Sequence, residues 1–160
     1  MKKYVIAYLA FFTVMTITMP ALAGSRDECI SKCKEASEYV QNHGIDAAVK
    51  EISNKNGLFV WNKGISYVFL MNLKGKMLAH PHDPNLAKRD TLIDLVDTDG
   101  KPFVKGMLRT AEKGKGWSKY NWPVPGMDVV KPKHTFIYRI PDTDYFVGAG
   151  IYIMGPSVYY

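Results

Sequence analysis

The sequence of 160 residues lacks most of the motifs that identify an enzyme or a nucleic-acid-binding protein. It contains no Gly-x-Ser-x-Gly nucleophile elbow and no glycine-rich phosphate loop of the Walker type. Its formal net charge is +6, yet acidic residues are interspersed among the lysines and no basic block forms. We therefore predict a protein that is not an enzyme, carries no cofactor and binds no nucleic acid.

Cysteine is scarce, with only Cys29 and Cys33 in the chain. Their spacing is one helical turn, which places the Cα atoms near the upper limit for a disulfide, and the loop closed would be very short. A strained Cys29–Cys33 disulfide, a bridge between two chains and two free thiols are all compatible with this spacing. No metal site is expected, because no nearby His or Cys completes a set of four ligands, and His80, His82 and Asp83 flank a proline in a loop.

No apolar stretch reaches the roughly 20 residues that span a bilayer as a helix. The longest, residues 4–19, follows the positively charged start Met1-Lys2-Lys3 and precedes the small-x-small sequence Ala21-Leu22-Ala23. This pattern is typical of a signal peptide. We predict a leader over residues 1–23, cleaved after Ala23, and a periplasmic or secreted mature protein. A leader that is kept as an anchor is the alternative.

The composition, with 47% hydrophobic and 12% aromatic residues, favours one domain with a single core. A helical segment is predicted over residues 24–57. It opens with a Ser25–Glu28 capping box and continues with apolar residues at helical spacing. Asn42-His43-Gly44 interrupts the pattern, so the segment forms two helices or one kinked helix. Packing on a sheet and acting as the arm of a homodimer are both compatible with this segment, alone or together.

The remaining pattern predicts an α+β fold with a PAS-like antiparallel sheet of about five strands. A hairpin surrounds Lys74-Gly75, and a helix separates strands 2 and 3. Two long loops, 81–99 and 123–132, are candidate lids over a pocket. The predicted elements are strands 67–72 and 77–80, the helix 102–113, and strands 117–122, 135–140 and 145–153.

Aromatic and cationic side chains alternate in the last third of the chain. Residues two apart on a strand share a face, so Tyr120 and Trp122 project together. Lys131 and Lys133 do the same if the proline between them is extended. Rings beside ammonium groups on a curved sheet suggest a small pocket for a compact anion with an apolar tail.

Four sequence blocks in register resemble the single Cache domain, type 2. They are Lys74–Pro81, Gly116–Pro123, Pro132–Arg139 and Val147–Tyr152, and the resemblance covers roughly Ser25 to Ile153. It implies that residues 58–160 form an extracytoplasmic sensory domain that binds small metabolites, often short organic acids, in the concavity of its sheet. Such domains usually belong to chemoreceptors or histidine kinases.

We expect this chain to depart from the usual arrangement, with neither a second membrane segment nor an output domain before Tyr160. We expect a stand-alone module that acts in signal transduction and chemotaxis through a membrane receptor or kinase partner. The alternative is a redox or protein-interaction module that works through Cys29 and Cys33, with the sheet as a scaffold.

The expected ligand is a carboxylate of two to four carbons, whose charge Lys133 would balance. His80 ends the hairpin, where the resemblance places the pocket, and its alternative role is a strand-end histidine bonded to the loop backbone. Each ring has an ordinary core packing role as its alternative. The residues predicted to bind the ligand are His80, Trp117, Tyr120, Trp122, Lys133, Tyr138 and Tyr152.

Overall fold

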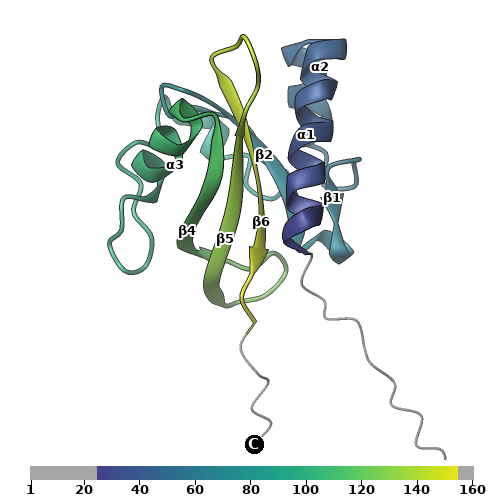
Figure 1. The fold of residues 1–160 in the computed structure, drawn as a ribbon. Helices are drawn as coiled ribbons and strands as arrows, with labels where there is room; N and C mark the ends of the chain where they lie inside the picture. Colours follow the sequence, from purple (N-terminus) through teal and green to yellow (C-terminus); the bar gives the residue numbers. More distant parts are fainter. Residues whose placement is uncertain (1–24, 155–160) are drawn as a thin grey trace, which may run out of the picture.

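The computed structural model describes residues 25–154, in which two N-terminal helices pack on one antiparallel sheet (Figure 1). The predicted leader lies outside the described residues. The helix α1 (Arg26–His43) begins with the predicted capping box: the Glu28 amide donates to the Ser25 hydroxyl at 3.0 Å, and the Ser25 amide donates to the Glu28 carboxylate at 2.8 Å. Gly44, with a φ of 81°, ends α1 and starts α2 (Ile45–Ile52). The N-terminal segment is therefore two helices.

The described sheet has six strands in the order β1-β2-β6-β5-β4, with β3 also paired to β2. The sequence predicts five, and the sixth is the two-residue β1, which pairs with the start of β2. The predicted helix between the hairpin and the last three strands is α3 (Phe103–Glu112). The α+β, PAS-like prediction is confirmed. The strands are β1 (Val60–Trp61), β2 (Ser66–Asn72), β3 (Met77–Ala79), β4 (Lys115–Pro123), β5 (Val130–Arg139) and β6 (Tyr145–Tyr152), with short 3-10 turns at Asn62–Gly64 and Leu86–Lys88.

The two faces of the sheet pack against different parts of the chain. Alternate residues of β2, β5 and β6, such as Val68, Phe136 and Ala149, meet α1 in one core cluster. The residues between them, such as Phe69 and Ile137, face α3 and the loop 81–99 in a second cluster. Figure 1 shows α1 and α3 on different sides of the strands. The second face is the one that contains a cavity.

The two cysteines lie in the interface between α1 and the sheet. Both are fully buried free thiols, and the Cys33 thiol donates to the carbonyl oxygen of Phe136 at 3.6 Å. Burial raises the pKa of the Cys29 thiol to about 12, so the reactive thiolate is disfavoured. The disulfide named as one reading of the spacing is corrected: in the structure both side chains pack separately against the sheet, one helical turn apart.

Candidate ligand-binding site

Lys133 projects from β5 onto the face of the sheet that bears the cavity, and only 1% of it is exposed. Its methylene chain crosses Gly150 of the neighbouring strand β6. A Cβ at position 150 would lie 2.6 Å from Cε of Lys133 and 2.6 Å from Oγ1 of Thr135. Gly150 therefore makes the room in which the lysine is buried.

The ammonium group of Lys133 has no hydrogen-bond partner, and Nζ is the only such buried side-chain atom among the described residues. It lies 3.7 Å from the ring centroid of Tyr67 and 4.9 Å from that of Tyr152, so its contacts are cation–π contacts. Burial lowers the pKa of Lys133 from 10.5 to about 7. A buried cation without an anion is costly, and a carboxylate beside it would remove that cost.

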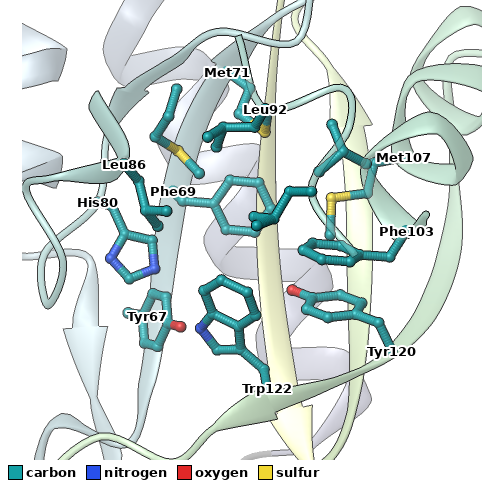
Figure 2. A pocket seen from close by; sticks show the side chains of 13 residues that line it. Tyr67, Phe69, Met71, His80, Leu86, Leu92, Phe103, Met107, Tyr120 and Trp122 are labelled. Atoms are coloured by element: carbon teal, nitrogen blue, oxygen red, sulfur yellow. The ribbon is translucent and has the colours of Figure 1, made fainter. Parts of the chain in front are cut away.

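The two tyrosines whose rings face the ammonium group direct their hydroxyls to other partners. The Tyr152 hydroxyl donates to the carbonyl oxygen of Pro123 at 2.7 Å. The Tyr67 hydroxyl interacts with the side chains of Tyr152 and Trp122, and Figure 2 shows the indole nitrogen turned toward it. Burial raises the pKa of both tyrosines, so the hydroxyls stay protonated. They are hydrogen-bond donors at neutral pH.

His80 is buried at the end of β3 and held in one tautomer. Its Nδ1 accepts from the backbone amides of His82 at 3.3 Å and of Asp83 at 2.9 Å, so the proton of the neutral ring is on Nε2. Burial, with a smaller effect of Lys133, lowers the pKa of His80 to about 3. The ring packs edge-on against Tyr67 at 4.8 Å. His80 is therefore a neutral donor, and it both bonds to the loop backbone and lines the cavity.

The cavity itself is small and apolar (Figure 2). The Tyr120 ring stacks on Phe103 at 4.4 Å, and its hydroxyl is 3.0 Å from Oγ1 of Thr135. The volume is about 20 Å³, which is room for about one water molecule. The lining residues are Tyr67, Phe69, Met71, Met77, His80, Leu86, Leu92, Leu95, Phe103, Val104, Met107, Tyr120 and Trp122.

A second, open cleft of about 290 Å³ adjoins this cavity. Tyr67, His80 and Trp122 line both spaces. The other walls of the cleft are the His82–Asp83 corner and the turn at residues 123–126. These three rings are therefore shared by the closed cavity and by a space that is open to solvent.

The structure brings five of the seven predicted residues together on one face. His80, Tyr120 and Trp122 line the cavity, and Lys133 and Tyr152 lie beside it on the same side of the sheet.

Trp117 and Tyr138 are not brought into this group, which corrects their predicted place. The Trp117 ring packs on Phe136 at 5.3 Å and below the Arg26 guanidinium at 4.1 Å, on the α1 side. Tyr138 stacks on Phe136 from the same side. The reason is strand parity: Trp117 is an odd number of residues from Tyr120, and Tyr138 is an odd number from Lys133, so each projects to the opposite face.

Residues outside the predicted set also form the site. Tyr67 and Phe69 come from β2, whose first six residues are all buried. Because both faces of this strand are covered, its sequence shows no polar alternation that would tell one face from the other. Leu86, Leu92 and Leu95 come from the long loop 81–99. Their apolar character in an otherwise polar loop was the available signal.

Asp97 holds the end of the loop 81–99 against the sheet, where Asp99 also accepts a hydrogen bond from the Asn121 side chain at 2.7 Å. Asp97 accepts hydrogen bonds from the backbone amides of Asn121 at 2.9 Å, Lys101 at 3.0 Å and Asp99 at 3.0 Å. These bonds, that from Asn121 most of all, hold the pKa of Asp97 below its usual value. Asn121 stands between Tyr120 and Trp122 on β4, so the loop is fixed next to two cavity rings.

Within residues 25–154 no group of three His, Cys, Asp or Glu side chains is arranged to hold a metal ion. None of the described helices has the length and apolar character needed to cross a membrane.

The family model of dCache_2, described as a Cache domain, matches residues 32–155. This chain belongs to the Cache domain family. The Cache assignment drawn from the sequence is confirmed. Two curated relatives are sensory proteins: the sensor histidine kinase MctS of Rhizobium johnstonii, 26% identical over 87 residues, and the methyl-accepting chemotaxis protein McpP of Pseudomonas putida, 30% identical over 88 residues. Each match covers 54% of this chain, but the chain spans only 19% and 16% of the two relatives.

Solved structures of chemosensory proteins share the fold. A methyl-accepting chemotaxis protein from Vibrio parahaemolyticus has a TM-score of 0.67 at 21% identity, covering 79% of this chain and 87% of that one. A Cache chemosensory domain studied for carboxylic acid recognition has a TM-score of 0.62 at 21% identity, covering 80% and 88%. A periplasmic sensor domain of a chemotaxis protein has a TM-score of 0.62 at 24% identity, covering 80% and 90%. At these identities the likeness concerns the fold.

Proposed function

We propose that this Cache domain binds a monocarboxylate of two to four carbons. The observation that carries the proposal is the buried ammonium group of Lys133, which has no anionic or hydrogen-bonding partner. The ligand carboxylate pairs with this ammonium group, and the hydroxyl of Tyr67 and Nε2 of His80 are the nearby donors. Its aliphatic part enters the apolar cavity beside Tyr120 and Trp122.

The charge balance of the site favours one carboxylate over two. Lys133 is the only buried lysine or arginine among the described residues, and the cavity lining contains no charged side chain. The second carboxylate of succinate would lose its hydration without gaining a cation. The α-ammonium group of an amino acid would contact the same uncharged lining and would lie near the like charge of Lys133. We therefore expect discrimination against dicarboxylates and amino acids.

The closed cavity also limits ligand size and requires movement. Its volume of about 20 Å³ is below that of any organic acid. Leu86, Leu92 and Leu95 form part of the wall and belong to the loop 81–99, so displacement of this loop enlarges the space. The loops 81–99 and 123–132 then close over the bound acid, and this closure changes the packing of the helices.

The sensory relatives support a role in signalling outside the cytoplasm. The domain functions after export directed by the leader 1–23, and it transmits occupancy to a membrane receptor or kinase, or through a homodimer that α1 forms. A redox function is not favoured, because Cys29 and Cys33 are fully buried and burial raises the pKa of both.

The test is calorimetric titration of purified protein with acetate, propionate, butyrate, succinate, alanine and propylamine. We expect binding of the three monocarboxylates alone. Lys133→Met should weaken binding by about 10- to 100-fold, the value of a charge-assisted hydrogen bond. It should leave the melting temperature unchanged or higher, because an uncompensated buried charge is removed.

Lys131→Met is the matched control, since Lys131 lies on the same strand but is partly exposed. It should bind within about twofold of the wild type. Equal affinity of the folded Lys133→Met protein for propionate would remove Lys133 from the site. Heat from succinate or propylamine but not from propionate would overturn the proposed ligand class.

A further inference from the structure

A groove runs along the exposed side of β4, the last strand in the sheet, next to α3. Its volume is about 520 Å³, and it shares only Phe103 with the apolar cavity. The residues that line it include four cations and no acid. These cations are Lys101, Arg109, Lys113 and Lys119.

Three of these cations have no anion to pair with inside the domain. Arg109, Lys113 and Lys119 make no side-chain hydrogen bond or ion pair within residues 25–154. The Lys101 ammonium group donates to the backbone oxygen of Lys119 across one end of the groove. By contrast, Lys105, which is on α3 but does not line the groove, is 3.6 Å from the carboxylate of Asp94. Positive charge that no acidic side chain neutralises therefore lines the groove.

The edge of β4 also presents backbone groups that the sheet leaves unpaired. In an antiparallel pair, alternate residues turn their amides away from the partner strand, and β4 pairs only with β5. The amide of Asn121 points outward to Asp97, so the amides of Lys119 and Trp117, two and four residues earlier, point outward too. Neither has a hydrogen-bond acceptor among the described residues.

Gly106 keeps the groove open in the middle of α3. Glycine is unfavourable inside a helix, so its presence there needs a reason. A Cβ at this position would have its nearest neighbours at 4.0 Å, on Arg109 and Ser118. Packing of α3 therefore does not require glycine. A larger side chain would project into the groove.

We propose that this groove binds an extended segment of a partner protein that carries acidic side chains at alternate positions. The segment adds to the sheet as a strand beside β4, and its carbonyl groups accept hydrogen bonds from the amides of Trp117 and Lys119. Its carboxylates at alternate positions lie on the α3 face and pair with Arg109 and Lys113, and an acidic side chain of the opposite parity pairs with Lys119, which projects to the same face as Trp117. Pairing of β4 with β4 of a second copy is disfavoured, because the lysines at positions 115 and 119 of one copy would lie opposite lysines of the other copy, and like charges across strands repel.

The test is selection of displayed random heptapeptides on purified protein. We expect enrichment of Asp and Glu at alternate positions. The selected peptide should bind at least 10-fold more weakly to Arg109→Glu and Lys119→Glu. Lys105→Glu, with the same charge change on the same helix, should stay within about twofold. No acidic enrichment, or equal binding to the Arg109→Glu and Lys119→Glu variants, would overturn the proposal.

Three further measurements separate strand addition from attraction between charges alone. Hydrogen exchange of the Trp117 and Lys119 amides should slow on peptide binding, and unchanged exchange overturns strand addition. Gly106→Leu keeps every charge and suits a helix, yet should weaken the peptide at least 10-fold by filling the groove. Competition by single-stranded DNA of equal charge would show a general polyanion site and overturn a peptide groove. Titration of the same variants with propionate tests the proposed small-acid site, and its result does not depend on whether the peptide binds.

Discussion

At the residue scale, the site contains two buried basic side chains, Lys133 and His80, that differ in protonation at neutral pH. The Lys133 ammonium has aromatic faces but no hydrogen-bond acceptor around it, and burial lowers its pKa to about 7. His80 receives two backbone amides on Nδ1, and burial lowers its pKa to about 3. At neutral pH the lysine is therefore poised between its two forms, whereas the histidine is neutral.

Ligand affinity should depend on pH through Lys133. Below about pH 7 the ammonium form predominates, and a short carboxylic acid stays ionised down to about pH 5. We expect the affinity for propionate to be greatest between about pH 5 and 7. Above that range each pH unit should lower it about 10-fold, because the lysine must regain a proton to bind. Calorimetry from pH 5.5 to 9 measures this slope, and a flat profile would mean that Lys133 is not the counter-charge.

The stability of the ligand-free protein should rise with pH, whereas its affinity for the ligand should fall. The folded-state pKa of Lys133 is below the unfolded value of 10.5, so the unfolded chain binds more protons between about pH 7 and 10. Its contribution therefore makes the folded state more stable as pH rises through this range. Lys133→Met removes the dependence. Urea unfolding of both proteins at pH 7 and 9 tests it, and a parallel change in the two would contradict this assignment.

Strand parity decided which predicted residues reached the site. Period-two alternation predicted that Tyr120 and Trp122 share a face, and both line the cavity. The register of β4 and β5, which places Lys133 opposite Tyr120 on the same face, comes from the structure. Trp117 and Tyr138 carry suitable side chains on the same strands but have the other parity. Their inclusion followed residue type, and alternation alone was enough to exclude them.

At the element scale, α1 holds one side of the sheet and begins with a complete capping box. Its buried side consists of small residues, including Cys29, Cys33 and Ala36, that allow close contact with the strands. The cavity face is different, since glycines on β6 make room for larger groups. Gly148 accommodates the ring of Phe69, and Gly150 accommodates Lys133.

Loss of the cap should destabilise the domain without changing the site. Ser25→Ala removes the acceptor for the Glu28 amide, and we expect the free energy of unfolding to fall by about 1 kcal/mol. Urea denaturation measures this change. Ser31→Ala, an exposed position inside the same helix, is the control and should have a smaller effect. Propionate affinity should be the same in all three proteins; a weakened affinity in Ser25→Ala would show that α1 is coupled to the site.

At the scale of the whole molecule, the cavity is closed by chain segments that are distant in sequence. The loop 81–99 supplies leucines to one wall, and Asp97 attaches this loop to β4 through Asn121. The cations on the edge of β4 face a separate groove. One domain thus presents an internal cavity beside a buried lysine and an external strand edge lined by cations.

The loop should open more readily when its attachment is removed. Asp97→Ala deletes three hydrogen bonds from backbone amides, and we expect hydrogen exchange across residues 84–98 to become about 10-fold faster. Asp94→Ala is the control in the same loop, since Asp94 makes only an exposed ion pair with Lys105. Exchange in the Asp97→Ala loop at the wild-type rate would show that Asp97 is not what holds the loop closed, and that its other contacts, such as the bond from the Leu92 amide to Gly75, are enough.

The sequence by itself determined the order of helices and strands, the capping box of α1 and the Cache family. Each of these depends on local periodicity, caps and short blocks, which neighbouring residues in the chain encode. The sequence also indicated Lys133 as a candidate binding residue, because its position on a predicted strand among aromatic residues can be recognised from neighbouring residues in the chain.

Only the tertiary structure decided that Lys133 is buried without a partner, that His80 is neutral, and that the loop leucines close the cavity. Burial, desolvation and contacts across the sheet depend on residues far apart in the chain. For the same reason the two cysteines proved to be buried free thiols, although their spacing alone left three readings open.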